Sequence, residues 1–123
     1  MRQDGHVTDK NEHPLIEQYY AAMVSGDDVR LGALYADEAL VIRFAGSVRG
    51  RNAITDFLRG VRAEHKPFEL QAVTQVRATD DIVMWDALIT TSVGVLQTTD
   101  VVVVDSDGLI DHHVLGNRGY WGR

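Results

Sequence analysis

Residues 97–117, QTTDVVVVDSDGLIDHHVLGN, predict a β-hairpin around which the rest of the chain is organised. The valines at 101–104 are β-branched, and such residues disfavour a helix and suit a strand that is buried on both faces. Residues 105–108 follow as a turn, in which Gly108 can supply a positive φ angle. A second strand over residues 109–117 completes the hairpin.

Polar side chains interrupt the apolar pattern of this hairpin. Because side chains alternate between the two faces of a strand, Asp100 shares a face with Val102 in the first strand. In the second strand His113 and Asn117 share a face, whereas His112 points the opposite way, towards solvent or a subunit interface. A valine face that carries one carboxylate, beside a strand that carries histidines, is the pattern expected for the wall of a pocket.

Length and composition describe one globular domain. The chain has 123 residues, of which 45% are hydrophobic and 24% are charged. Its net charge is −6, so we expect no nucleic-acid partner, since a phosphate backbone needs a basic face. No apolar run approaches the roughly 20 residues of a membrane span, and the N-terminus lacks the apolar core of a signal peptide. We therefore expect a cytoplasmic protein without a membrane partner.

The sequence favours neither a metal nor a cofactor. It contains no cysteine, which excludes disulfides, thiolate catalysis and cysteine metal ligands. His112 and His113 are adjacent, so their side chains diverge on a strand, and no third ligand is spaced to join either of them. Neither a phosphate-binding glycine loop nor a nucleophile elbow is present.

The predicted helices precede the predicted strands. Residues 1–12 are polar and lack periodicity, so we expect a flexible arm, followed by a single domain over residues 13–123. Apolar spacing predicts a helix that opens at Pro14 and ends near Gly26, a short second helix that includes Tyr35, and a third helix from Arg51 to about residue 65. Extended segments are predicted over residues 39–45, 68–78, 82–92, 97–105 and 109–117.

This order indicates an α+β architecture, with three N-terminal helices gathered on one face of a sheet. The strands are more hydrophobic than burial of a single face requires. Residues 82–85 (IVMW) and 101–104 (VVVV) show no polar alternation. We therefore expect a second subunit to cover the open face of the sheet, which makes the protein a homodimer.

Several short stretches follow one another along the chain: residues 16–27 (IEQYYAAMVSGD), 34–40 (LYADEAL), 48–58 (VRGRNAITDFL) and the hairpin around Asp100. Their order and spacing resemble the nuclear-transport-factor-2-like superfamily, particularly its ketosteroid-isomerase-like and SnoaL-like (polyketide cyclase) branch. The resemblance covers nearly everything after His13. It implies a conical α+β barrel, in which a curved, mixed, mostly antiparallel sheet wraps a long helix and encloses an apolar pocket. It also implies a dimer.

The same resemblance suggests site residues. In the steroid-isomerase pattern a tyrosine of the first helix and a carboxylic acid of the sheet donate hydrogen bonds to a developing enolate, while an aspartate moves the proton. Tyr19 lies at the tyrosine position and Asp100 at the position of the sheet acid. Arg43 lies at the position of the base, and a guanidinium cannot take up a proton. The chain therefore departs from the steroid-isomerase constellation at its base.

His113 is the hypothesised replacement for that base. The resemblance turns its strand position into the pocket, and a neutral imidazole can accept a proton near neutral pH. Asp100 or Asp86 would orient the ring, while Tyr19 and Arg43 bind the substrate oxygen. The alternatives are a histidine and a tyrosine that belong to the core, and an Asp100 carboxylate that is paired at a strand end.

The remaining candidates are substrate-binding residues. Arg43 and Asp86 form either a buried ion pair or a device that positions a substrate oxygen or a water molecule, and Asp86 is expected on the pocket side of its strand. Asn117 either binds a substrate oxygen or forms a turn. Trp85 and Leu58 belong to the core or line the pocket.

Two functions remain open from the sequence. The first is a small cofactor-independent pocket enzyme that performs proton-transfer chemistry (isomerisation, cyclisation or dehydration) on an apolar oxygenated small molecule. The second is a non-catalytic small-molecule-binding or dimerisation module of the same fold.

Overall fold

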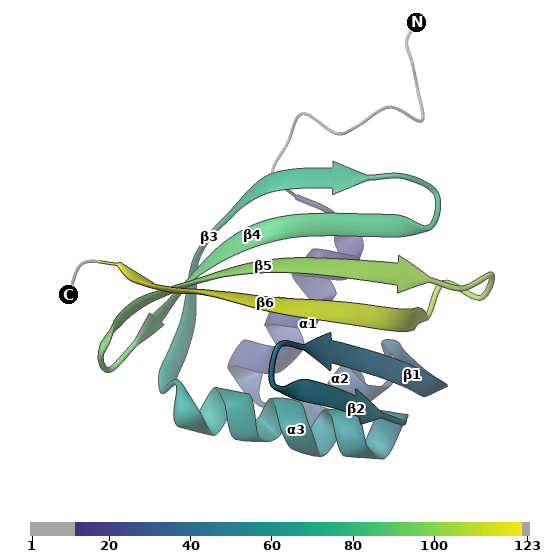
Figure 1. Cartoon of the computed structure of the whole chain (residues 1–123), viewed down its shortest axis with the longest axis horizontal. Coiled ribbons are helices and arrows are strands. Elements are labelled where there is room, and N and C mark those ends of the chain that lie inside the picture. The colour runs from purple at the N-terminus through teal and green to yellow at the C-terminus, as the bar shows by residue number, and fades with distance from the viewer. Residues whose placement is uncertain (1–11, 122–123) are drawn as a thin grey trace, which may run out of the picture.

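Three helices and six strands make up residues 12–121, the part of the chain that the computed structural model describes (Figure 1). The predicted N-terminal arm lies outside the described residues, except for Glu12. The helices are α1 (Pro14–Ser25), α2 (Asp28–Gly32) and α3 (Arg51–Glu64). The strands are β1 (Tyr35–Arg43), β2 (Gly46–Arg49), β3 (Pro67–Ala78), β4 (Ile82–Thr91), β5 (Gly94–Val104) and β6 (Ile110–Trp121).

Helix α1 has clear start and stop signals. The Nδ1 atom of His13 accepts a hydrogen bond from the backbone N–H of Leu15 at 3.1 Å, and Pro14 occupies the first turn, where its missing N–H costs nothing. Gly26 ends the helix with φ 79°, a left-handed conformation that glycine adopts without strain. The helix buries Tyr19 and Tyr20 against the sheet, and both belong to the hydrophobic core.

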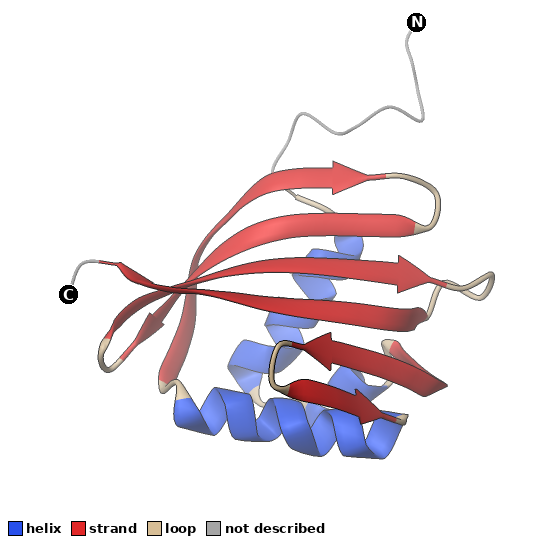
Figure 2. Ribbon diagram, in the orientation of Figure 1, coloured by secondary structure: helices blue, strands red, loops and turns tan. Residues whose placement is uncertain are grey.

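The strands form one sheet in the order β2-β1-β6-β5-β4-β3. Only β1 and β6 run parallel, and every other neighbouring pair in the described sheet is antiparallel. The helices gather on one face of this curved sheet, which does not close into a complete barrel (Figure 2). The predicted α+β class, with three N-terminal helices and a curved, mixed, mostly antiparallel sheet, is confirmed.

Tyr35 was predicted in the second helix, and that prediction is wrong. Helix α2 ends at Gly32, and Tyr35 opens β1, where it pairs with Ile110 of β6. A five-residue helix has little intrinsic stability, so tertiary pairing decides the conformation of the residues that follow it. The backbone N–H of Ile110 donates to the carbonyl of Leu34 at 2.8 Å and fixes the start of this parallel pair.

The burial pattern of β4 corrects a second prediction. Trp85 is buried on the face that the helices cover, whereas Asp86 is only half-buried and lies on the opposite, outer face. Cross-strand pairing agrees, because Trp85 lies opposite the buried Asp100 of β5. The expectation that Asp86 faces the pocket is therefore wrong. Alternation shows which residues of a strand share a face, but the packed helices decide which face is inside.

The outer face of the sheet carries an apolar row across its central strands. Ile42, Val114, Val101 and Met84 are successive cross-strand neighbours on β1, β6, β5 and β4. Ile42, Val114 and Met84 expose 37%, 40% and 38% of their surface. We call these four residues the outer apolar row. No helix of the described residues is long and apolar enough to span a membrane.

Candidate active site

Three buried polar side chains meet beneath the helices. His113 of β6 lies between two partners: its Nε2 atom is 2.8 Å from Oδ2 of Asp100, and its Nδ1 atom is 2.7 Å from the hydroxyl of Tyr35. The strand order brings them together, because β6 lies between β1 and β5. All three side chains are almost completely excluded from solvent. Asp100 and His113 both lie on the inner face of the sheet, and Tyr35 is a partner that the sequence did not suggest.

Hydrogen-bond satisfaction assigns the protons in this network. The hydroxyl of Tyr35 has Nδ1 of His113 as its partner, and burial together with the charge of Asp100 raises the pKa of this phenol well above 10. The phenol is therefore neutral and donates to Nδ1, since its buried O–H would otherwise lack an acceptor. The ring proton then sits on Nε2 and donates to the Asp100 carboxylate. Both nitrogens of His113 are thus occupied.

Asp100 has one oxygen left. Its Oδ1 atom is buried and has no hydrogen-bond partner among the described residues. Asp100 lines a small, partly open cavity of about 40 Å³, whose walls come from α1, α3 and strands β3 to β6 and are mostly apolar. That volume holds about three water molecules. A carboxylate oxygen without a partner in such a setting is costly and strongly attracts a proton or a hydrogen-bond donor.

Two tyrosines of α1 complete the polar lining of the cavity. The ring of Tyr19 packs edge-on against the ring of His113 with centroids 5.5 Å apart, and no residue within 12–121 is hydrogen-bonded to the Tyr19 hydroxyl. The hydroxyl of Tyr20 accepts a hydrogen bond from Nε1 of Trp85 at 2.8 Å. Burial raises the pKa of both phenols well above 10, so near neutral pH each one is a proton donor.

The structure separates Arg43 from Asp86. Arg43 lies at the end of β1 with its guanidinium over the ring of Phe57, 4.7 Å from the ring centroid. Asp86 lies on the outer face of β4, where it accepts a hydrogen bond from Oγ1 of Thr99 at 2.7 Å. Strands β6 and β5 stand between them. The predicted buried ion pair between Arg43 and Asp86 is therefore wrong, and Asp86 does not join the site.

The other predicted residues take different places. Asn117 is exposed, and its Oδ1 atom accepts from the backbone N–H of Gly119 at 2.8 Å, so it shapes a bulge in β6. Leu58 is fully buried and lines the cavity. Trp85 is buried in the same core but does not line the cavity. His112 is exposed on β6, with Nδ1 at 3.1 Å from Asp111.

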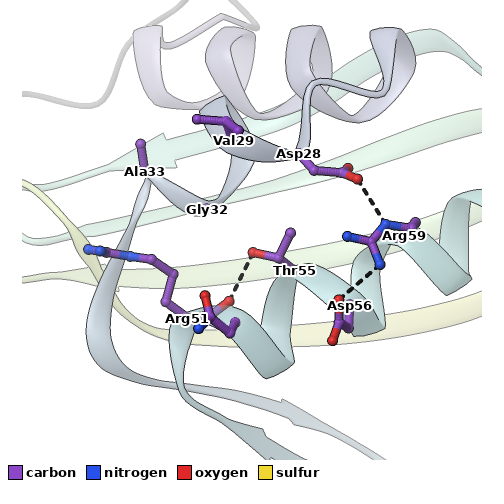
Figure 3. Close-up of a pocket in the computed structure, with 9 residues that line it drawn as sticks. Asp28, Val29, Gly32, Ala33, Arg51, Thr55, Asp56 and Arg59 are labelled. Carbon is purple, nitrogen blue, oxygen red and sulfur yellow. Dashed lines mark hydrogen bonds and ion pairs between the residues drawn. The ribbon is translucent and has the colours of Figure 1, made fainter.

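A larger hollow of about 680 Å³ lies on the surface between α2 and α3 (Figure 3). Its charged groups are already satisfied, because Arg59 pairs with Asp28 at 2.8 Å and with Asp56 at 2.9 Å. The hollow is open to solvent, and none of the buried polar network reaches it. Among the described residues, no cluster of three histidine, aspartate or glutamate side chains could hold a metal ion. The small cavity beside Asp100 is therefore the better candidate site.

Comparisons with known proteins identify the family of this fold. The family model of the SnoaL-like domain matches residues 16–113. Similar structures include a proposed isomerase of the SnoaL-like family from Agrobacterium tumefaciens, with 19% identity, TM-score 0.73, and coverage of 85% of this chain and 95% of that one. A SnoaL-like protein of unknown function from Burkholderia thailandensis has 13% identity, TM-score 0.75 and coverage of 91% and 98%. A proposed polyketide cyclase from Sinorhizobium meliloti has 15% identity, TM-score 0.74 and coverage of 85% and 95%. No curated protein matches the sequence significantly.

Proposed function

Because the chain belongs to the SnoaL-like domain family, we propose that it is a small pocket enzyme that moves a proton next to a carbonyl group of an apolar, oxygenated small molecule. Isomerisation, cyclisation and dehydration all begin with such a step. Similar proteins described as a proposed isomerase and a proposed polyketide cyclase support this class of chemistry.

One observation carries the proposal, namely the free Oδ1 atom of Asp100 in the wall of the cavity. The sequence suggested His113 as the proton acceptor, but both of its ring nitrogens are already hydrogen-bonded. The proposal therefore exchanges the roles of the two residues. Asp100 takes the proton, and His113 positions the carboxylate by donating a hydrogen bond to its other oxygen.

The proposed reaction uses the groups that line the cavity. The carbonyl oxygen of the substrate accepts a hydrogen bond from Tyr19, whose hydroxyl has no partner among the described residues. Oδ1 of Asp100 then removes a proton from the neighbouring carbon, and the Tyr19 hydrogen bond strengthens as negative charge develops on the oxygen. A positioned general base of this kind typically supplies about a hundred- to ten-thousand-fold in rate. Return of the proton from Asp100 to another carbon gives isomerisation. Attack by the enolate carbon on a second carbonyl carbon of the same molecule, whose π electrons move to its oxygen and whose oxygen takes up that proton, gives cyclisation.

The small volume of the cavity favours the second candidate function, a non-catalytic module, and within it dimerisation over small-molecule binding. A space of about 40 Å³ does not hold a ring-sized molecule unless lining side chains move. Phe68 of β3 is one of the side chains that line this space. Its backbone φ of 53° is unusual for a non-glycine residue. In this alternative the Tyr35–His113–Asp100 network only stabilises the fold.

Solvent hydrogen exchange separates the two functions. A panel of apolar ketones is incubated with the protein in D₂O, and deuterium uptake next to the carbonyl is followed by NMR. We expect wild-type protein to accelerate uptake for at least one ketone, and Asp100→Asn to reduce that rate by about a hundredfold or more. Asp86→Asn is the matched control, because it makes the same change on the outer face. No acceleration by the wild type, or an equal rate in Asp100→Asn, would favour the binding module.

We also propose that two copies associate through the outer apolar row. The supporting observation is that Ile42, Val114 and Met84 are partly exposed side by side on a regular sheet face. Burial of apolar surface contributes about 25 cal/mol per Å² to association. The same sheet face of a second copy would therefore cover the outer apolar row favourably.

A further inference from the structure

Within residues 12–121, Arg43 is a cation without a polar partner. Its Nε atom is buried and no described residue accepts a hydrogen bond from it, while the guanidinium stacks on the ring of Phe57. Every other arginine in residues 12–121 forms an ion pair with a carboxylate or donates to a carboxylate, a carbonyl or a hydroxyl group. The protein is acidic overall, with a net charge of −6, so carboxylates are plentiful elsewhere on the chain. The lack of a polar partner is therefore specific to Arg43 and does not reflect a shortage of carboxylates in the protein.

The position is connected to the candidate active site through the register of the sheet. Arg43 of β1 lies opposite Leu115 of β6, and Leu115 lies opposite Asp100 of β5. Two strand spacings therefore separate Arg43 from Asp100, or about 10 Å between their Cα atoms. Leu115 lines the cavity, and so does Leu58 of α3, the residue next to the Phe57 on which the guanidinium stacks. Arg43 thus stands one strand beyond the cavity wall, on the side of β1 and α3.

A guanidinium is always charged, and a buried N–H without an acceptor is costly. Its planar set of donors matches a carboxylate, which accepts two parallel hydrogen bonds. We propose that Arg43 binds a carboxylate group of the ligand. The second half of the inference rests on the function proposed above: the substrate is an apolar molecule with an acid group at one end and the reacting carbonyl near Asp100.

A matched pair of probes tests this assignment. The keto acid 7-oxooctanoate carries a carboxylate and a ketone at opposite ends of an apolar chain, and its primary amide differs from it mainly in charge. Binding of each probe to the full chain is measured by NMR titration. We expect wild-type protein to bind the acid about tenfold more tightly than the amide, since a charge-assisted hydrogen bond is worth roughly that much.

The variants distinguish Arg43 from the general charge of the surface. Arg43→Gln should bind the acid and the amide equally, and Arg43→Lys should recover part of the preference for the acid. Arg49→Gln on the neighbouring strand β2 is the control and should behave as the wild type does, since the Arg49 side chain donates to the backbone carbonyl of Glu38 on the exposed surface. Thermal unfolding checks that each variant is folded.

Three outcomes would overturn the inference: equal affinity of the wild type for acid and amide, a preference that persists in Arg43→Gln, or no binding of either probe. Deuterium uptake by the same keto acid keeps this test separate from the proposed function. Preference for the acid without uptake would retain the Arg43 site and refute proton transfer by Asp100. Deuterium uptake without a preference for the acid would retain proton transfer by Asp100 and refute the Arg43 site.

Discussion

Tyr35→Phe tests the buried hydrogen-bond network with the smallest possible change. The substitution removes one hydroxyl oxygen, 2.7 Å from Nδ1 of His113, and leaves a ring of the same shape in a fully buried position. It leaves Nδ1 as a buried acceptor without a donor. Such a loss costs about 1–3 kcal/mol of unfolding free energy. For a domain of this size, that cost lowers the melting temperature by about 4–15 °C.

The assay is urea unfolding combined with a double-mutant cycle. Tyr35→Phe should lower the unfolding midpoint without changing the m-value, because the surface exposed on unfolding stays the same. In a His113→Leu background the same substitution should cost less by about 0.5–3 kcal/mol, since its partner is already absent. Additive effects of the two substitutions, or a Tyr35→Phe variant as stable as the wild type, would refute the network as we assign its protons.

Alkaline pH should destabilise the protein through its buried phenols, because burial raises the pKa of Tyr19, Tyr20 and Tyr35 above 10. Their contribution to the unfolding free energy is complete below pH 10. Above pH 10 it is lost by about 1.4 kcal/mol per pH unit for each phenol. Urea unfolding between pH 8 and 11 measures this loss, and a flat profile through pH 11 would contradict it. Met84→Lys in the outer apolar row should convert a dimer into a monomer by introducing a charge into the buried interface. Light scattering at micromolar concentration reports the change, and a wild type that is already monomeric would refute the dimer. Leu58→Ala should enlarge the cavity and cost about 2–5 kcal/mol of unfolding free energy, whereas a loss below 1 kcal/mol in urea unfolding would show that the site collapses.

Alternation along the hairpin strands, together with the family resemblance, suggested Asp100 and His113 as site residues. Alternation grouped each of them with its neighbours on one face of its strand, and pairing of β5 with β6 brings the two side chains within 2.8 Å of each other. The four valines and the glycine turn likewise predicted the hairpin, in which Gly108 has φ 80°. These features are local, so the sequence carries them directly.

The features that could not be predicted depend on distant contacts. Tyr35 enters the site because β1 pairs in parallel with β6, which is far away in the sequence. Asp86 lies outside because the helices cover the other face of β4. Asn117 keeps the regular register with Thr98, but its side chain is exposed and accepts from Gly119 at the bulge that follows it in β6. The periodicity of the sequence does not show how distant strands pair or which face of the sheet the helices cover.

Chemical rescue tests most directly whether the carboxylate of Asp100 moves the proton. Asp100→Ala removes the carboxylate and enlarges the cavity of about 40 Å³ that Asp100 lines. Tyr19, which also lines this cavity, packs against the ring of His113. For a ketone whose deuterium uptake the wild type accelerates, the variant should lose that acceleration. Added formate should then restore part of it in proportion to its concentration, whereas chloride at the same ionic strength should not. Loss of uptake that formate cannot restore in a folded variant, or uptake that survives in Asp100→Ala, would contradict the role of Asp100 as the proton-transfer group.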